Sequence, residues 1–567
     1  MKRFRWQILV AVAGVVAILL LLLAVKGPVL RPNTPAVQAT RGGTYREALV
    51  GSLQRLNPVL DSYNQPDRDV DRLIFSGLVG FDSTGAPIPD LAEGWVIGDD
   101  GLSYTVVLRP DVTWHDGEPI TSRDVLYTYG VLQDKNYPGP PDLARLWRSV
   151  KVAALDDRTV VFTLPEPFAP FLDFLSQGLL PEHLLRDVSA ADLAGQTFNV
   201  SPVGSGPFRL DHLLVEQDRI TGLVLKPYKN HYGPKAYLEE VEFRYFPSVE
   251  AAFGALEAGQ VMGLGGLTPP LVEPALRLSM LQMFSAREPR MALVFFNLKN
   301  EEVPFFASRE VRRALLLAVN RQRIVDSVLF GQAVPAAGPL LPGSWAADPA
   351  ITPEAYDPLQ AERMLETAGW KLPTGATAGD ASYVRTKEET PLRFSLAHPD
   401  DAVHTRTAQM LQTMWAEVGV QVDLLAVPAG SLVSDYLAPR SYQAVLADLS
   451  LARFPDPDPY TFWHQTQISS GQNYSQLDDR SISEVLEIAR TEPNPANRAK
   501  LYRSFQYRFN YQVPALVLWY PTYSYALDVR LNGVRLGPLV DASDRLTSLS
   551  QWYLISAPAT PATVSTP

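Results

Sequence analysis

Two hydrophobic patterns, one of period two and one of about 3.6 residues, follow one another along most of this chain. Val420, Val422 and Leu424 alternate with polar residues, which is typical of a strand with one buried face. Residues 311–319 instead place apolar side chains at positions i, i+3, i+4, i+7 and i+8, which predicts an amphipathic helix. Strand and helix patterns that alternate in this way indicate an α/β fold.

Capping residues mark the expected helix boundaries. Ser248, Ser308 and Asp357 each precede a helical pattern, and their side-chain oxygens can accept hydrogen bonds from the free N–H groups of a first helical turn. Gly259 and Gly369 follow two of these patterns, where a left-handed residue commonly ends a helix. These signals predict three helices, each starting one residue after its cap.

One segment in the first quarter of the chain combines several local signals. Residues 99–101 (DDG) and 114–117 (WHDG) form turns on either side of an alternating strand at 104–108. Thr121 and Asp124 then have the spacing of a capping box, which opens a helix. The segment therefore predicts a turn, a strand, a second turn and a helix, in that order.

Composition and charge exclude some functional classes. The 567 residues are 46% hydrophobic and 20% charged, which is typical of a globular protein with several domains. The net charge of −11 argues against general nucleic-acid binding, which needs an excess of Lys and Arg. The sequence contains no cysteine, so disulfides, thiol catalysis and thiolate metal sites are excluded.

The amino-terminal residues predict a membrane anchor. An uncharged run of 18 residues, 8–25, follows Lys2, Arg3 and Arg5, and an apolar helix of that length can just span a bilayer. A cleaved signal peptide is the alternative, because residues 37–39 (VQA) have the composition of a cleavage site, although they lie far beyond the apolar run. We favour the uncleaved anchor, which places the rest of the chain on the extracytoplasmic face of the cell membrane, in the periplasm or at the cell surface.

Several long motifs resemble those of a known family. They are LAEGWVIGDDGLSYTVVLRPDVTWHDGEPITSRDV (91–125), SPVGSGPFRL (201–210), DPLQAERMLETAGW (357–370) and FPDPDPYTFWHQTQ (454–467). Together they resemble the family 5 extracytoplasmic solute-binding proteins, which are the dipeptide, oligopeptide and nickel receptors of ABC importers. The resemblance extends over the whole extracytoplasmic part of the chain.

The resemblance implies an architecture that the hydrophobic patterns alone do not predict. It implies an α/β fold of the periplasmic-binding-protein-like class II type, with two lobes joined by a hinge and an inserted extra domain. Hinge strands are expected near residues 295 and 520, and the lobes are expected to close on ligand. The expected divisions are an anchor at 1–26, a linker at 27–40, domain I at 41–84, 200–295 and 520–556, domain II at 85–199, domain III at 296–519 and a disordered tail at 557–567.

Common catalytic motifs are missing from the sequence. It contains no G-x-S-x-G elbow and no H-E-x-x-H, and its seven histidines are scattered. Asp456 and Asp458 could act as paired carboxylates, but their alternation with prolines favours a rigid loop. We therefore expect a protein that is not an enzyme and that needs neither a cofactor nor a metal.

Residues 442–474 contain the aromatic and polar side chains that a ligand cleft requires. In the family this stretch meets ligand, and peptide-binding members carry an aspartate shortly before the PDP run that pairs with the ligand α-ammonium. Here Arg453 lies near that position and Asp448 five residues earlier, so the amine anchor is either shifted or missing. Arg453 either binds an anionic ligand group or forms a salt bridge with Asp456 or Asp458. The candidate ligand-binding residues are Tyr63, Asn64, Asn297, Asp448, Arg453, Asp456, Tyr460, Trp463, Asn473 and Tyr474.

These features predict an extracytoplasmic receptor that captures peptides or similar oligomeric solutes in an interdomain cleft and delivers them to ABC permease subunits. We expect a monomer that is attached to the membrane through its N-terminal helix and binds no nucleic acid. One alternative is a membrane-anchored sensor or scaffold that keeps the fold without transport. Another, within the family, is a nickel- or sugar-binding protein, and a secreted hydrolase is a more remote one.

Overall fold

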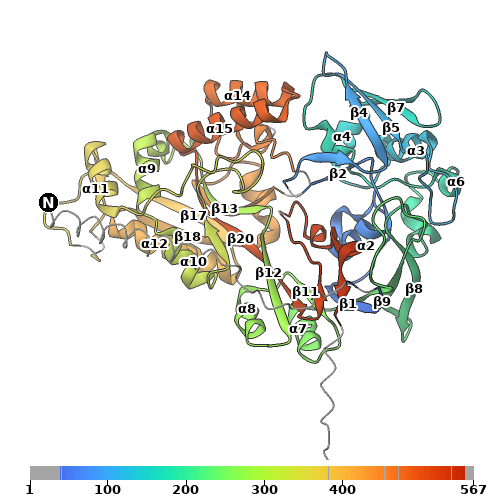
Figure 1. Cartoon of the computed structure of the whole chain (residues 1–567). Coiled ribbons are helices and arrows are strands. Elements are labelled where there is room, and N and C mark those ends of the chain that lie inside the picture. The colour runs from blue at the N-terminus through green and yellow to red at the C-terminus, as the bar shows by residue number, and fades with distance from the viewer. Residues whose placement is uncertain are drawn as a thin grey trace, which may run out of the picture.

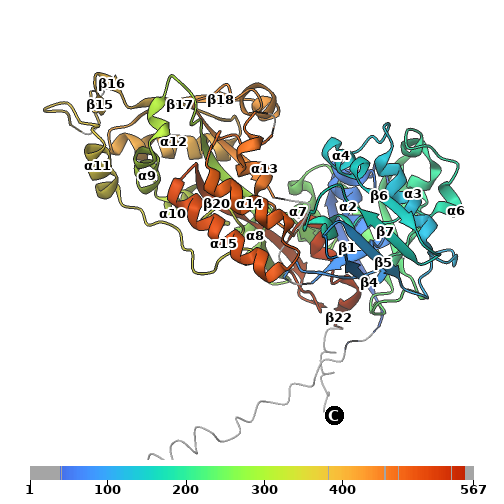
Figure 2. The same ribbon diagram turned by 90° about the horizontal axis from the view of Figure 1, so that it is seen from above.

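A computed structural model describes residue 39 and residues 41–82, 84–377, 379–380, 382–451, 455–469, 471–537 and 539–555. It has two lobes side by side, one formed mainly by the first half of the chain and one mainly by the second half (Figures 1 and 2). The predicted anchor at 1–26, the predicted tail at 557–567 and Arg453 lie outside the described residues. Within those residues, no helix has both the length and the apolar character that a membrane crossing requires.

One mixed sheet runs through both lobes, with twelve strands in the described part of the chain. Its hydrogen-bonded order is β18 (Gln421–Val427), β17 (Arg393–Pro399), β19 (Ala444–Ser450), β13 (Arg290–Phe296), β20 (Ala515–Asp528), β11 (Gly263–Gly265), β1 (Thr44–Val50), β10 (Glu240–Phe246), β9 (Arg219–Pro227) and β8 (Phe208–Glu216). Beside this path, β12 (Leu281–Arg287) and β14 (Ala333–Pro335) pair with β20. The long strand β20 is therefore central to the architecture.

Strand β20 joins the two lobes. Its first residues, Ala515–Trp519, pair with β13 in the second lobe, and its last residues pair with β11 and β12 in the first lobe. The chain also passes between the lobes at residues 288–289, where β12 leads into β13. The expected hinge positions, 295 and 520, lie on β13 and β20.

The first lobe adds a small antiparallel sheet to its part of the large one. Its order is β4 (Ala92–Ile97), β5 (Ser103–Leu108), β7 (Thr159–Thr163) and β6 (Lys151–Ala154). The predicted strand at 104–108 is confirmed as β5, and both reciprocal hydrogen bonds of the Thr121–Asp124 capping box are present. The helices of this lobe are α2 (Gln65–Ile74), α3 (Ser122–Gln133), α4 (Pro141–Ser149), α5 (Phe171–Phe174), α6 (Glu182–Leu185), α7 (Val249–Glu257) and α8 (Pro269–Leu276).

The second lobe buries its sheet on both faces. In β13, Ala292, Val294 and Phe296 belong to one hydrophobic core, while Leu293 and Phe295 belong to another on the opposite face. Helices α9 (Arg309–Leu317), α10 (Arg321–Val328), α11 (Pro358–Thr367) and α12 (Ala402–Glu417) cover the first of these cores. Helices α13 (Tyr460–Trp463), α14 (Arg480–Thr491) and α15 (Pro495–Gln512) cover the other (Figure 2).

The helix starts predicted from sequence are confirmed. The side chains of Ser248, Ser308 and Asp357 each accept a hydrogen bond from an N–H group of the first turn of α7, α9 and α11. Gly259 and Gly369 follow α7 and α11 with positive φ, as expected at a helix end. The remaining strands form three short pairs, β2 (Val79–Phe81) with β3 (Pro87–Pro89), β15 (Thr386–Lys387) with β16 (Thr390–Pro391) and β21 (Leu531–Asn532) with β22 (Tyr553–Leu554).

Candidate functional site

A cavity of about 620 Å³ lies between the lobes. Its lining combines first-lobe residues, among them Phe81 and Leu539, with second-lobe residues that include Leu341, Leu451 and Pro455. Most of these walls are apolar. A cavity of this size, with walls from two lobes, is typical of a small-molecule or peptide site.

Three arginines supply the positive charge of this cavity, which is called the larger cavity below. Arg72 on α2 forms an ion pair with Asp544. Arg287 donates from Nη1 to the carbonyl oxygen of Pro342 at 2.9 Å, and it has no ion pair among the described residues. The guanidinium of Arg535 makes neither a hydrogen bond nor an ion pair within the described part of the chain. Two cations without a carboxylate partner suit a ligand that carries an anionic group.

A second cavity of about 390 Å³ also has Arg72 in its lining. First-lobe residues form most of it, including Asp61, Arg68 and Asp71, while Ser450 at the end of β19 belongs to the second lobe. Its surface is more polar than that of the larger cavity. The two cavities thus share one arginine and differ in the chemistry they offer to a ligand.

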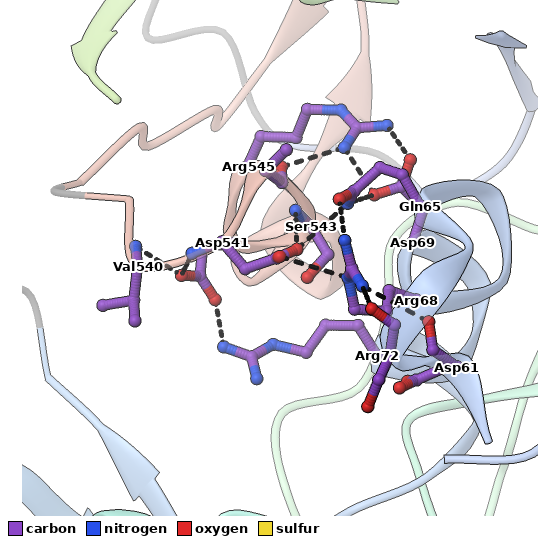
Figure 3. Close-up of polar contacts among 12 residues, drawn as sticks. Asp61, Gln65, Arg68, Asp69, Arg72, Val540, Asp541, Ser543 and Arg545 are labelled. Carbon is purple, nitrogen blue, oxygen red and sulfur yellow. Dashed lines mark hydrogen bonds and ion pairs between the residues drawn. The ribbon is translucent and has the colours of Figure 1, made fainter. Parts of the chain in front are cut away.

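A polar network connects α2 and β1 with the C-terminal segment beside these cavities (Figure 3). Arg545 in the 3-10 helix η8 (Ala542–Leu546) donates to Asp69 on α2 at 2.8 Å and pairs with Glu47 on β1 at 2.6 Å. Burial alone would lower the pKa of Arg545, but the carboxylates of Asp69 and Glu47 outweigh it and raise that pKa. Arg68 pairs with Asp541 at 3.2 Å. These pairs fix the C-terminal segment against α2.

Four of the residues predicted from sequence are buried and have internal partners. Asn297, Asp456, Trp463 and Asn473 are at most 7% exposed. Asn297 and Asn473 donate through their amides to backbone carbonyls of nearby loops. The ring of Trp463 packs edge-on against Phe509 in the core. These side chains hold the second lobe together.

The other five described candidates have partly or fully exposed side chains: Tyr63, Asn64, Asp448, Tyr460 and Tyr474. Tyr63 is 73% exposed in the 3-10 helix η1 (Asp61–Tyr63), whose other two residues line the smaller cavity. Asp448 pairs with Arg290 at 3.1 Å. The structure does not gather the nine described candidates in one site. The loops that carry Tyr63 and Asp456 border the cavities through neighbouring residues, and ligand contact by the candidates stays a prediction.

Sequence reasoning missed the cavity-lining residues of α2 and of the C-terminal segment. Helix α2 carries the run DRDVDR (67–72), in which Arg68, Asp71 and Arg72 line a cavity. A dense run of both charges directly before the apolar LIF segment (73–75) is the signal that could have drawn attention to it. Arg535 gives no comparable signal, because its neighbours in sequence form no recognisable pattern.

A polar contact also joins the lobes directly beside the cavity walls, because Pro455 and Pro457 on either side of Asp456 line the larger cavity. Oδ2 of Asp173 on α5 accepts a hydrogen bond from the backbone N–H of Asp456 at 2.8 Å. Nearby, the N–H of Ala169 donates to the carbonyl oxygen of Arg490 at 2.7 Å. The carboxylate of Asp456 itself pairs with Arg498 at 2.9 Å. The lobes are therefore held together on one side by this contact and on the other by β20.

Comparison with known proteins finds matches among bacterial solute-binding proteins. A family profile described as "Bacterial extracellular solute-binding proteins, family 5 Middle" matches residues 86–471. The oligopeptide-binding protein AppA of Bacillus subtilis is 27% identical over 518 residues, which cover 90% of this chain and 91% of that protein.

Two solved structures show the same fold. AppA from Bacillus subtilis in complex with a nonapeptide matches with a TM-score of 0.66 and 25% identity, covering 92% of this chain and 100% of that one. NikZ from Campylobacter jejuni in complex with Ni(L-His) matches with a TM-score of 0.68 and 25% identity, covering 90% and 99%. The family profile covers well over half of this chain, and the two-lobed α/β fold agrees with it. The chain therefore belongs to the bacterial extracellular solute-binding proteins of family 5.

Proposed function

We propose that this chain is the receptor of an ABC importer and that it captures peptides in the cavities between its lobes. The observation that carries the proposal is the larger cavity, which both lobes enclose with apolar walls and into which Arg287 and Arg535 bring positive charge that has no ion-pair partner among the described residues. Apolar walls accept peptide side chains of many kinds, and arginine binds a terminal carboxylate. The similarity to the oligopeptide-binding protein AppA supports a peptide ligand.

Closure of the two lobes would report that ligand is bound. The lobes are connected by β20 and by the passage from β12 to β13, so a small change in these strands can separate them. A ligand that contacts both lobes loses contacts on opening, and it shifts the equilibrium towards the closed form by that difference in affinity. The permease would then recognise the closed arrangement of the two lobes.

The family is extracellular, so the chain acts on the outer side of the membrane. We propose that residues 8–25 form the helix that anchors it there and that the protein works as a monomer beside its permease subunits. Tethering would keep the receptor near the permease, where its effective concentration is high.

Thermal unfolding of the purified full-length chain tests the ligand class. Three probes are compared: a synthetic pool of random pentapeptides, a pool of neutral oligosaccharides, and Ni²⁺ with histidine. A ligand present at 100 times its Kd stabilises the folded state by about 2.7 kcal/mol, which raises the Tm measurably. We expect the peptide pool to raise the Tm. A shift with the sugars or with nickel–histidine and none with peptides would contradict the proposal.

A matched pair of arginine variants tests the larger cavity. Arg535→Ala removes a side chain that has no internal partner in the described residues, so we expect an unchanged fold. We expect it to weaken binding of peptides with a free carboxyl end by roughly tenfold, the effect of one charge-assisted hydrogen bond. Arg530→Ala is the control, because Arg530 pairs with Asp528 and does not line the cavity. Equal affinities for the two variants would show that Arg535 does not contact the ligand.

A further inference from the structure

Helix α15 presents a row of positive charge to solvent. Its 18 residues, Pro495–Gln512, include four cations and neither aspartate nor glutamate, whereas the whole chain has a net charge of −11. Arg498 is buried. Lys500, Arg503 and Arg508 are exposed, and none of the three has an ion pair in the described part of the chain. The exposed face of this helix is therefore basic in an acidic protein.

Two tyrosines lie on the same side of the helix as these cations. Tyr507 and Tyr511 are 56% and 58% exposed, and with Arg503 they follow a spacing of four residues, which places them on one face. The guanidinium of Arg309 lies 4.0 Å from the centre of the Tyr511 ring, at the end of the row. We call this surface the basic–aromatic stripe, and it consists of Lys500, Arg503, Tyr507, Arg508 and Tyr511.

The neighbouring helix α14 shows that such a surface is not general in this lobe. Both of its cations are paired with carboxylates, Arg480 with Glu487 at 2.7 Å and Arg490 with Asp458 at 2.7 Å. On α15, the carboxylate of Asp348 is hydrogen-bonded to Tyr507 and offsets part of the charge of three cations. The basic–aromatic stripe therefore keeps positive charge for a partner outside the lobe.

The stripe lies on the side of the molecule from which the chain leads back to the proposed anchor. In Figure 2, α15 runs along the lower side of the second lobe, and β22 lies on the lower side of the first lobe. Gly43 lies against Leu554 of β22. Residues 26–42 connect Gly43 to the proposed anchor and can extend to about 60 Å at most, which is comparable to the diameter of a globular protein of this length. A membrane surface is therefore within reach of this side.

We propose that the basic–aromatic stripe binds the headgroups of anionic lipids and thereby rests the second lobe on the membrane surface. Each lysine or arginine near an anionic lipid surface favours the bound form by about fivefold. Tyrosine rings favour the level of the headgroups, because one end of the ring is apolar and the other is polar. The net negative charge of the rest of the chain is repelled by the same lipids, so this contact orients the molecule. The inference goes beyond the proposed function, because it concerns lipid and not the transported ligand.

Energy transfer from the protein to labelled lipid headgroups tests the contact. Because the sequence has no cysteine, Ala496→Cys at the start of α15 gives a unique donor site beside the stripe, and Leu359→Cys on α11 gives a comparison site in the same lobe. Each full-length protein is reconstituted into vesicles of neutral phosphatidylcholine, or into vesicles in which phosphatidylglycerol replaces about a third of that lipid. We expect energy transfer from position 496 to rise in the anionic vesicles and to change less at position 359. The rise should disappear as the salt concentration increases from about 0.05 M to about 0.5 M.

Three triple variants separate charge at the stripe from charge in general. The first removes the three cations, the second exchanges them for one another, and the third removes one lysine and two arginines that are exposed elsewhere in the second lobe and have no ion pair among the described residues. None of the substituted residues lines either cavity between the lobes, so peptide binding should be unchanged in all three. The variants are Lys500→Gln/Arg503→Gln/Arg508→Gln, Lys500→Arg/Arg503→Lys/Arg508→Lys and Arg323→Gln/Lys371→Gln/Arg406→Gln.

We expect the first variant to lose the rise at position 496, as a roughly 100-fold smaller ratio of bound to unbound lobe requires. The second and third variants should keep it. A rise that the first variant retains, a rise that the third variant loses equally, or equal rises at positions 496 and 359 overturn the inference. Absence of any rise also overturns it, and binding of soluble polyglutamate near position 496 would then assign the stripe to an acidic protein.

Discussion

Asp173 is the residue through which pH is expected to act on the contact between the lobes. It is 4% exposed, and its carboxyl group meets the backbone N–H of Asp456 at 2.8 Å. Burial first, and then the negative charge of Asp456, raise the pKa of Asp173 to about 8. The contact therefore contains a protonated carboxyl group at neutral pH.

The direction of the effect follows from proton uptake. When the lobes separate, Asp173 meets water and its pKa falls towards the ordinary 3.8. The contacting form then binds a proton that the separated form does not, so the contact is strongest below about pH 4 and weakens as the pH rises towards 8. If the pKa of Asp173 returns fully to its ordinary value on separation, the free energy of the contact between the lobes changes by about 1.4 kcal/mol per pH unit over this range. Two units, from pH 5 to pH 7, would change the ratio of separated to contacting forms by roughly 100-fold, and partial exposure would still leave about tenfold.

Fluorescence energy transfer between the lobes measures this ratio. Because the sequence has no cysteine, Leu155→Cys in the first lobe and Leu359→Cys in the second give two unique labelling sites. Both positions are well exposed, at 68% and 63%. We expect the labels to move apart as the pH is raised from 5 to 8. Asp173→Asn, which stays neutral and still accepts the hydrogen bond, should remove this pH dependence.

The control is Glu166→Gln, a change of charge at an exposed position of the same lobe, which should leave the pH dependence as it is. The reasoning is refuted if the distance between the labels does not change with pH in the natural protein. It is equally refuted if Asp173→Asn follows the same curve as the natural protein.

Three further substitutions test interactions that stabilise each lobe internally. Arg545→Met leaves Glu47 and Asp69 buried without their cation, so we expect a loss of about 3–5 kcal/mol in the free energy of unfolding. Urea denaturation measures this loss, and a value below about 1 kcal/mol would show that the network contributes little. Trp415→Ala empties a fully buried site in the second lobe and should cost about 3–5 kcal/mol, seen as a lower Tm, whereas an unchanged Tm would contradict the assigned packing. Thr121→Ala removes the cap of α3 and should cost about 1 kcal/mol, with faster hydrogen exchange confined to the first turn of that helix.

Local elements could be predicted from the sequence because their causes are local. Ser308 starts α9 through a hydrogen bond within one turn, and the strand at 104–108 follows from alternation alone. The two-lobed arrangement was not visible in any such pattern and followed only from the family resemblance. Its physical basis is β20, whose two ends pair with strands more than 200 residues earlier in the chain.

The cavities could not be predicted because their walls come from distant segments. Helix α2, the loop at 341–344 and residues 535–551 each contribute side chains, and no sequence pattern relates the three. The aromatic residues of 442–474 suggested a ligand site, yet Trp463 and Tyr442 belong to the core of the second lobe. Aromatic side chains fill cores and line clefts equally well, so their presence alone does not separate the two roles.

The arrangement of the two cavities limits the shape of the ligand that can close the lobes. Arg72 lines both cavities, and the second lobe reaches them with adjacent residues at the end of β19, Ser450 in the smaller and Leu451 in the larger. A ligand confined to one cavity contacts only one of these two positions, so it gains less from closure than a ligand that spans both. Among the described residues, the guanidinium of Arg535 in the larger cavity has no ion-pair partner, whereas both arginines of the smaller cavity are paired with carboxylates. On the proposed function, a ligand that spans both cavities keeps contacts with both lobes as they close, and the free carboxyl end of a peptide in the larger cavity would meet Arg535.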